Sequence, residues 1–274
     1  MGSSGKVSET SRGPHAPIAR VAEFRFYEEL NDFLPPARRK KNFTYRFRGT
    51  PSVKDTIEAI GVPHTEIDLI LVDGRSVEFD HTLRGGERVA VYPMFERLDI
   101  SPVNRLRPAP LRETRFVVDV HLGTLARYLR LLGFDTVWRN DLADPEIIQC
   151  ALAESRIILT RDLGILKDGR VTHGYWLRTT DAMGQVDEVM QAFDLGTQLA
   201  PYTRCMECNG ILATLPRRQA ATRVPLQVFL VYRDFKHCND CGRVFWPGSH
   251  QRRLEAVIAR ARAAAETHRV DPRS

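Results

Sequence analysis

Residues 115–135 read RFVVDVHLGTLARYLRLLGFD, an apolar stretch that ends on a carboxylate and then changes to a helical pattern. Residues 116–118 predict a short buried strand, and Asp119 closes it. A helix follows, because apolar residues recur at helical spacing and form one face that packs on the sheet. These residues are Leu122, Leu125, Ala126, Leu129 and Leu132. Arg127 and Arg130 are expected to stay off that face.

Strands and helices alternate after this first strand and helix. Gly133 is expected to end the helix, and DTVWR (135–139), RIILT (156–160) and GYWLR (174–178) predict three further strands. Residues 144–154 predict a helix between the second and third of the four strands. Strands that alternate with helices imply a parallel sheet with right-handed crossovers, so the predicted fold class is α/β.

The overall composition limits the class of protein. The 274-residue chain is long enough for two or three domains. It has 40 Lys and Arg residues against 34 Asp and Glu residues, and this net charge of +6 mildly favours an anionic partner such as nucleic acid. No apolar run approaches the roughly 20 residues that span a bilayer, and residues 1–17 lack the apolar core of a signal peptide. We therefore expect a soluble cytoplasmic protein with no membrane partner.

The N-terminal part shows a different order of elements. Five extended segments are predicted at 22–27, 43–47, 67–72, 77–79 and 88–93. A helix at 52–60 separates the second from the third; Ser52 is its N-cap and Asp55 stands at the reciprocal position. This order resembles a ubiquitin-like β-grasp domain, of the kind found in sulfur carriers. Carriers need a free C-terminal Gly-Gly, whereas Gly85 and Gly86 lie in a turn, so a module that docks a protein partner or stabilises the protein is favoured.

Four aspartates follow the predicted strands of the α/β part or begin its helices. They are Asp119, Asp144, Asp162 and Asp181. Because the carboxyl ends of parallel strands meet at one edge of a sheet, we expect these side chains to lie close together. Crowded carboxylates repel each other unless a hard divalent cation lies between them, and Mg²⁺ or Mn²⁺ prefers such ligands. Asp119, Asp144 and Asp162 are therefore predicted to hold one ion that activates water for attack on a phosphodiester.

Each of these acids also has a structural interpretation. Asp144 fits a helix N-cap before Pro145, Asp162 could cap a short helix at 163–166, and Asp181 could be a turn residue. Asp119 is harder to explain in this way, because a carboxylate that ends a buried strand is costly to desolvate without a partner. The metal-site hypothesis thus depends most on Asp119.

Basic and aromatic side chains give candidate contacts to RNA. They are Arg127, Arg130, Arg161, Trp246, Arg252 and Arg253. Aromatic residues beside arginines can stack the bases and hold the phosphates of single-stranded RNA. The alternative for the arginines is exposure to solvent or pairing with local acids. Phe245 is expected in a small core beside the cysteines, and for Trp246 both interpretations stay open.

Two Cys-x-x-Cys pairs are the most specific motif in the chain. Their members are Cys205, Cys208, Cys238 and Cys241. Four thiolates match tetrahedral Zn²⁺, and because all four positions are filled the ion is expected to be structural. The segment VPLQVFLVY (224–232) between the pairs predicts a strand of a zinc ribbon. The remaining Cys150 is expected to be a buried apolar residue of its helix.

These segments together resemble a known family, the PIN-like ribonuclease domain with a C-terminal zinc ribbon that is named for the C-terminal region of the Mut-seven mutator exonuclease. The matching segments are FVVDVHLGTLARYLRLLGFDT, the helix from Asp144, RIILTRD, CMECNGIL and CNDCGRVFWPGSH. Many bacterial members carry an N-terminal ubiquitin-like domain, which the first part of this chain resembles. One departure is Gln251, which follows Gly-Ser-His where family members often have an aromatic residue.

The resemblance implies a domain order and an activity. The order is a tail at 1–19, a ubiquitin-like β-grasp domain at 20–96, a linker at 97–114, a PIN-like nuclease domain at 115–200, a zinc ribbon at 201–253, and a helix and tail at 254–274. The family implies RNA cleavage by a metal held by acids, which carries over to Asp119 and Asp162 and further to Asp144 and Asp181.

Two functional hypotheses follow from the sequence. The leading one is a Mg²⁺- or Mn²⁺-dependent ribonuclease in which water is the nucleophile. The alternative is a non-catalytic RNA-binding or adaptor protein that uses the zinc ribbon and the β-grasp domain as contact surfaces. A toxin-like nuclease that a partner holds inactive is a third possibility.

Overall fold

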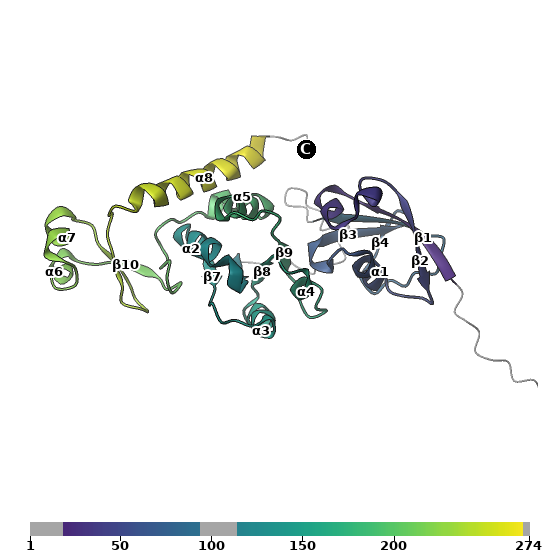
Figure 1. Cartoon of the computed structure of the whole chain (residues 1–274), viewed down its shortest axis with the longest axis horizontal. Helices are drawn as coiled ribbons and strands as arrows, with labels where there is room; N and C mark the ends of the chain where they lie inside the picture. The colour runs from purple at the N-terminus through teal and green to yellow at the C-terminus, as the bar shows by residue number, and fades with distance from the viewer. Residues whose placement is uncertain (1–18, 94–113, 271–274) are drawn as a thin grey trace, which may run out of the picture. The chain divides into compact units, whose positions relative to one another are not determined.

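The computed structural model describes residues 19–93 and 114–270, which form two compact units (Figure 1). The predicted tail before residue 19, the linker up to residue 113 and the chain after residue 270 lie outside the described residues. None of the helices in the described part of the chain has the length and apolarity that a bilayer crossing needs.

The first unit is a mixed five-stranded sheet with one α-helix, in the predicted order. Its strands are β1 (Ala19–Phe26), β2 (Phe43–Arg48), β3 (Ile67–Val72), β4 (Arg75–Ser76) and β5 (Arg88–Pro93). Its helices are α1 (Val53–Ile60) and the short 3-10 helices Glu28–Phe33 and Pro36–Arg38, whereas the 3-10 helix His64–Glu66 belongs to the second unit. The strand order is β2-β1-β5-β3-β4, with β1 parallel to β5 and antiparallel to β2. The Ser52 hydroxyl accepts from the backbone N–H of Asp55 at 3.0 Å, which confirms the predicted cap.

The short edge strand β4 lies earlier than the predicted segment at 77–79. Asp73 and Gly74 have φ angles of 48° and 81°, so the chain reverses there and pairing resumes at once, with Arg75 opposite Val72. Beyond β4, the Val77 N–H still donates to Ile70 at 3.1 Å before the next turn begins. The turn geometry, rather than the apolar residues after it, sets the position of this strand.

The second unit contains the predicted parallel sheet with helices on both faces. Its strands are β6 (Arg115–Val118), β7 (Asp135–Val137), β8 (Ile157–Thr160) and β9 (Gly174–Trp176). Its helices up to residue 198 are α2 (Gly123–Leu131), α3 (Asp144–Glu154), α4 (Leu163–Leu166), α5 (Ala182–Ala192) and the 3-10 helices Val120–Leu122 and Leu195–Gln198. All neighbours in the order β7-β6-β8-β9 are parallel. The predicted α/β fold class is therefore confirmed.

Alternation along β6 places its residues in two separate cores. Phe116 and Val118 face a core that contains α2 and α5, whereas Val117 faces a core that contains α3 and α4. The predicted apolar face of α2, from Leu122 to Leu132, is buried in the first of these cores. Gly133 has a φ of 101° and follows the C-cap of α2, as predicted.

The prediction that Arg130 stays off the packed surface of α2 is wrong. Arg130 is only 2% exposed, and its guanidinium donates to backbone carbonyls around it. Arg127, three residues earlier, follows the prediction, since 51% of its side chain is exposed. A sequence pattern separates polar from apolar residues, but it does not reveal that another part of the chain will cover one arginine.

The C-terminal helix α8 (Gln251–Val270) begins earlier than predicted and packs back on the α/β part of the unit. Val257, Ile258 and Ala261 are buried in the same core as α2 and α5. Figure 1 shows α8 running alongside α5, and Arg260 on α8 forms an ion pair with Asp187 on α5 at 2.6 Å. The helix is therefore part of the α/β core.

Between α5 and α8 the chain forms a small antiparallel sheet with two helices inserted in it. The strands are β10 (Leu212–Thr214), β11 (Lys236–Cys238) and β12 (Val244–Phe245), and the helices are α6 (Arg217–Ala220) and α7 (Leu226–Val231). The prediction of a strand at 224–232 is wrong, since this segment contains α7. Pro225 fits the start of a helix, and the Arg217 guanidinium donates to the Phe229 carbonyl near its C-terminal end at 2.8 Å.

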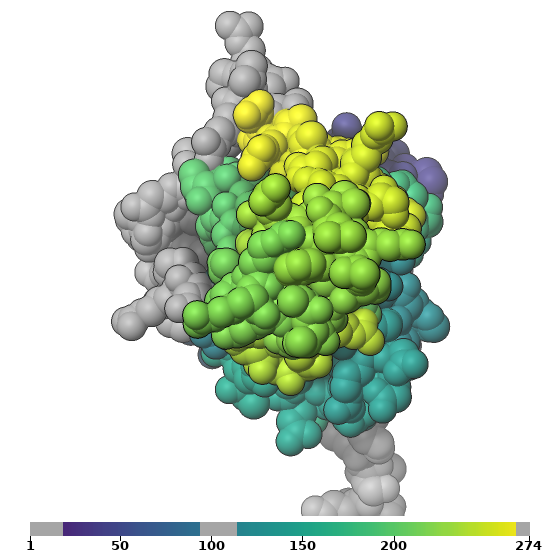
Figure 2. All heavy atoms as spheres, turned by 90° about the vertical axis from the view of Figure 1, so that its left-hand side faces the viewer, coloured from purple at the N-terminus to yellow at the C-terminus, as the bar shows by residue number. Residues whose placement is uncertain are grey.

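Helix α7 has one half-buried face and one exposed face. Phe229 packs with the small core of Leu215, Val224 and Phe235, and the Arg217 guanidinium lies 4.1 Å from its ring centroid. Leu226 and Leu230 are 70% and 68% exposed. Figure 2 looks onto this end of the unit, where α6 and α7 are drawn in green.

Candidate functional site

Asp119 and Asp162 are linked at the carboxyl edge of the parallel sheet by one threonine. The register pairs Val118 with Leu159, so Asp119 lies beside Thr160 at the end of β8. The Thr160 hydroxyl donates to Asp119 Oδ2 at 2.7 Å and accepts from the Asp162 backbone N–H at 2.8 Å. Asp119 is 7% exposed and Thr160 is fully buried. The partner that makes burial of the Asp119 carboxylate tolerable is thus a neutral hydroxyl.

Each of the four predicted acids follows one of the four parallel strands. Asp162 and Asp181 are N-caps, and their Oδ1 atoms accept from Gly164 N at 2.6 Å and Gly184 N at 2.8 Å. The capping interpretation of Asp162 is confirmed, and the prediction of a plain turn for Asp181 is replaced by a helix cap.

Asp144 is the first residue of α3, and Ala143 is the residue at the N-cap position. The capping interpretation of Asp144 is therefore wrong by one residue. The reciprocal contact comes instead from Glu146, whose carboxylate accepts from the Ala143 N–H at 2.9 Å. Asp144 itself is exposed.

The four acids do not form a closed set of ligands. Within the described residues, the four cysteines are the one group of three or more Asp, Glu, His or Cys residues with all ligand atoms within 4.8 Å of one another. Asp119 is buried, whereas Asp144, Asp162 and Asp181 are exposed, and two of these are held by amides of their own helices. The linked acids at this edge are therefore Asp119 and Asp162.

Arg161 helps to shape the same edge. Its Nη1 donates to the carbonyls of Leu177, Arg178 and Thr179, at 3.0, 2.9 and 2.7 Å. Its guanidinium thereby holds the segment that leads from β9 to Asp181. The predicted RNA contact at Arg161 thus coincides with a side chain that has a structural role.

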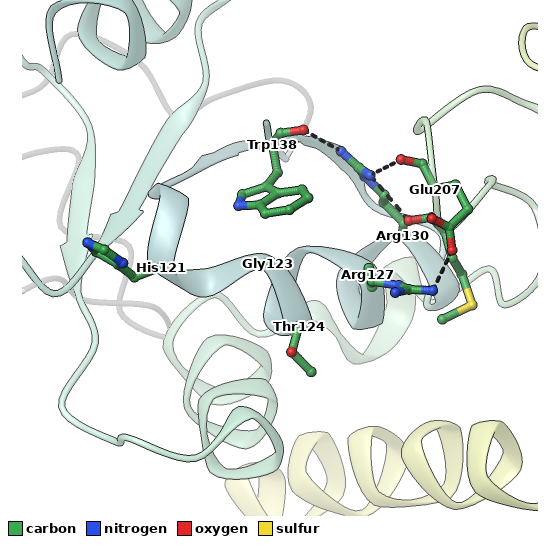
Figure 3. Close-up of a pocket in the computed structure, with 8 residues that line it drawn as sticks. His121, Gly123, Thr124, Arg127, Arg130, Trp138 and Glu207 are labelled. Atoms are coloured by element: carbon green, nitrogen blue, oxygen red, sulfur yellow. Dashed lines mark hydrogen bonds and ion pairs between the residues drawn. The ribbon is translucent and has the colours of Figure 1, made fainter. Parts of the chain in front are cut away.

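A cavity of about 290 Å³ lies beside α2 (Figure 3). Its lining residues are His121, Gly123, Thr124, Arg127, Arg130, Trp138, Met206 and Glu207. Trp138 Nε1 donates to the Val120 carbonyl at 3.1 Å, and Arg127 forms an ion pair with Glu207. The cavity thus combines an aromatic ring with charged groups of both signs, and its wall begins two residues after Asp119.

The four cysteines gather as the motif predicts. Cys205 and Cys241 sulfurs are 3.8 Å apart, and Cys208 and Cys238 sulfurs are 3.3 Å apart. Burial raises the pKa of the Cys205 thiol, and a bound cation would favour its thiolate form. A Cβ at Gly210 would stand 2.8 Å from the Cys238 sulfur, so this position requires glycine. The cluster can hold one metal ion.

The loop of the first cysteine pair is bound to the α/β sheet by polar contacts. Arg130 donates to the carbonyls of Glu207 at 2.8 Å and of Thr136 at 2.9 Å. Asn209 bridges to β7, because it donates to Asp135 Oδ1 at 2.7 Å and accepts from Thr136 N at 3.0 Å. Burial alone would raise the pKa of Asp135, but hydrogen bonds from Arg156 and Asn209 hold it below its usual value. The cysteine loop and the strand β7 are therefore coupled.

A family model described as the Mut7-C RNAse domain matches residues 114–258, which is more than half of the chain. The chain belongs to the Mut7-C RNAse family. A second model, described as Mut7-C ubiquitin, matches residues 19–99, so the first unit is ubiquitin-like. No curated protein and no solved structure matches the chain. The expected family is confirmed, as is a ubiquitin-like domain that precedes the RNAse domain.

The remaining residues predicted to contact RNA in this Mut7-C protein lie around the start of α8. Trp246 is 36% exposed, and Arg252 and Arg253 are exposed in the first turn. Arg253 donates to the Tyr128 hydroxyl at 3.3 Å. Phe245 is half-buried but lies outside the packed cluster of the small sheet, which differs from its predicted place in a core.

Sequence reasoning missed two residues of the site. Thr160 ends a predicted strand two residues before Asp162, so the register of the Mut7-C sheet could have placed it beside Asp119. Trp138 follows β7 and lies over Gly123, and only the fold brings them together: a Cβ at Gly123 would stand 2.5 Å from the indole. The small residue at 123 was the one signal for this close contact.

Proposed function

We propose that the chain is a Mg²⁺- or Mn²⁺-dependent ribonuclease that cleaves single-stranded RNA. The observation that carries this proposal is the network in which the Thr160 hydroxyl joins a buried Asp119 to Asp162 at the ligand-binding edge of the sheet. The match to the Mut7-C RNAse family supports the same activity. Cytoplasmic location stays a prediction from the sequence.

The residues at this edge fit a hydrated Mg²⁺ or Mn²⁺. Mg²⁺ usually keeps several waters and is held by one or two carboxylates together with substrate phosphates, so a closed set of three acids is not required. Asp119 and Asp162 would supply these carboxylates, and Asp144 and Asp181 would act through waters from the flanking helices. A bound ion would lower the pKa of its water and neutralise phosphate charge.

The protein's own part in the reaction is to hold the carboxylates and the edge in place. Thr160 fixes the Asp119 carboxylate through Oδ2, and α4 fixes Asp162 through the Gly164 N–H. Arg161 stabilises the loop that ends at Asp181. In this proposal water attacks the phosphorus, the P–O bond to a ribose oxygen breaks as that oxygen leaves and takes up a proton, and no covalent intermediate with the protein forms.

Asp119→Asn tests the proposal. Asparagine can still accept from Thr160, so the protein should stay folded while metal-dependent cleavage of single-stranded RNA falls by about 100-fold or more, since metal chemistry contributes several kcal/mol. Asp234→Asn, an exposed acid next to β11, is the control and should keep full activity. Unchanged cleavage in a folded Asp119→Asn protein would remove the proposal.

We also propose that the cysteine cluster holds a structural Zn²⁺, because four sulfurs fill all the positions of a tetrahedral ion and leave none for water. The ubiquitin-like unit is proposed to dock a protein partner.

A non-catalytic RNA-binding protein is the second candidate, favoured by the lack of a closed acid cluster in the described residues. Titration of the zinc-loaded protein with Mn²⁺ separates the two functions. The enzyme should show a further Mn²⁺ site that Asp119→Asn weakens, and the binding protein should not.

A further inference from the structure

The cavity beside α2 is formed by groups from three distant parts of the chain. His121, Gly123 and Thr124 come from the segment after Asp119, Trp138 follows β7, and Glu207 lies between the first two cysteines. Figure 3 shows the Trp138 ring beside the start of α2, with Arg127 and Arg130 reaching toward Glu207. The functional proposal above does not use this cavity.

Trp138 is held as a rigid aromatic wall. Its Nε1 donates to the Val120 carbonyl at 3.1 Å, and its own carbonyl accepts from Arg130 at 3.3 Å. Its six-membered ring lies so close to Gly123 that any side chain at that position would clash. An aromatic ring fixed in this way loses little entropy when a flat ligand stacks on it.

The charged residues of the cavity offer hydrogen bonds rather than a strong net charge. Arg127 has donors and Glu207 has acceptors, and they pair with each other across the wall. Arg243 also approaches Glu207, at 3.3 Å. A surface with one aromatic wall and both donors and acceptors matches the face and the edge of a nucleobase better than it matches a phosphate, which needs positive charge alone.

Size and position agree with a single base. The volume of about 290 Å³ is at the lower limit of small-molecule pockets and too small for a duplex. Asp119 is the N-cap of the short helix that leads into α2, and the Val120 carbonyl that fixes Trp138 belongs to the next residue. A base in the cavity would therefore belong to a strand that passes Asp119.

We propose that this cavity binds one unpaired nucleobase of the RNA strand, stacked on Trp138 and hydrogen-bonded at its edge by Arg127 and Glu207. This inference rests on the proposed ribonuclease function and adds a base-binding subsite to it. Such a subsite would favour single-stranded RNA, because a paired base would first have to be unpaired and unstacked.

The test uses the full-length, zinc-loaded Asp119→Asn protein and labelled single-stranded RNAs of about 12 nucleotides, a typical site size. One base at a time is removed to leave an abasic position, and binding is measured by fluorescence anisotropy. Loss of the base that enters the cavity should weaken binding by about 5- to 100-fold at one position. In Trp138→Leu, binding of the intact RNA should be weak and loss of that base should have no further effect.

Two further variants make the result independent of folding defects. Thr124 is exposed on the cavity wall, so Thr124→Tyr fills the cavity without removing core packing and should abolish the same position-specific effect. Leu152→Ala removes an exposed apolar side chain of α3, away from the cavity lining, and should keep it.

The outcomes separate this inference from the proposed function. Suppose the wild-type protein cleaves RNA, but an abasic position weakens RNA binding equally in Asp119→Asn proteins with and without Thr124→Tyr. The cavity then does not bind a base, and the proposed nuclease function stands. If the Asp119→Asn protein binds no RNA and the wild-type protein cleaves none, both proposals fail. A position-specific effect that Trp138→Leu and Thr124→Tyr remove, and Leu152→Ala keeps, supports the base-binding subsite.

Discussion

Thr160 shows how a single neutral side chain can organise an acidic site. Its hydroxyl has one proton and two lone pairs, and it uses them on both sides of the pair: it donates to Asp119 and accepts from the backbone of Asp162. Because the proton is committed to Asp119, the orientation of that carboxylate is fixed. Thr160 is thus a positioning residue, one step removed from the proposed metal.

Thr160→Val tests this role. Valine keeps the shape but removes both hydrogen bonds, so we expect the affinity for Mn²⁺ and the rate of RNA cleavage to fall by about 10- to 100-fold, as for other residues that orient metal ligands. Thr160→Ser restores the hydroxyl and should rescue both quantities. Isothermal titration with Mn²⁺ and cleavage assays provide the measurements. Wild-type Mn²⁺ affinity in a folded Thr160→Val protein would show that the hydroxyl does not position Asp119.

Among the elements, helix α2 links the sheet to the cysteine loop. Two arginines of α2 differ in what covers them. Arg127 is exposed and paired with Glu207. Arg130 is buried against backbone carbonyls of β7 and the cysteine loop. Burial lowers the pKa of Arg130, and the nearby Cys208 and Cys205 act in the opposite direction. Hydrogen bonds to the Thr136 and Glu207 carbonyls compensate for the burial of the Arg130 guanidinium.

Replacing each arginine by methionine compares two matched positions three residues apart. Arg130→Met leaves several buried carbonyls without a donor and should lower the free energy of unfolding by about 2–4 kcal/mol. Arg127→Met removes one exposed ion pair and should change it by less than about 1 kcal/mol. Urea denaturation of the zinc-loaded proteins measures both values. Similar values for the two variants would contradict the anchoring role of Arg130.

Over the second unit as a whole, the proposed zinc site is also a support for the α/β sheet. Asn209, which follows Cys208, bonds to Asp135 and to the Thr136 backbone, so order in the cysteine loop extends to β7. Glu207 and Met206 line the proposed base-binding cavity from the same loop. The proposed structural metal would thereby be coupled to the proposed RNA site without touching it.

Loss of zinc should therefore disturb more than the small sheet. Cys205→Ser and Cys238→Ser are expected to lose the metal, because zinc binding and folding are linked, and faster hydrogen exchange should appear in β10, β11 and β7. The control is Cys150→Ser, which changes a partly buried cysteine outside the cluster. This variant should keep the metal. Zinc analysis and hydrogen exchange by mass spectrometry are the measurements. Wild-type protection in metal-free Cys205→Ser would rule out this coupling.

The sequence by itself predicted the four strands of the α/β unit and its helices α2 and α3, because strands such as β6 are short apolar runs and α2 has a clear apolar face. Helix α5 was not predicted. The sequence also determined the cysteine cluster, since two Cys-x-x-Cys loops bring their ligands together locally. Helix α7 was mistaken for a strand because its apolar residues are continuous, and the capping contact from Arg217 is not local in sequence.

Only the tertiary structure decided which polar groups meet. The link through Thr160 depends on strand register, the burial of Arg130 depends on the cysteine loop that covers α2, and the cavity depends on Trp138 lying over Gly123. These contacts join residues far apart in the chain, and hydrophobic periodicity specifies the face of an element but not its neighbour. Local sequence patterns therefore predict most helices and strands of this protein. Long-range packing decides which residues form its candidate site.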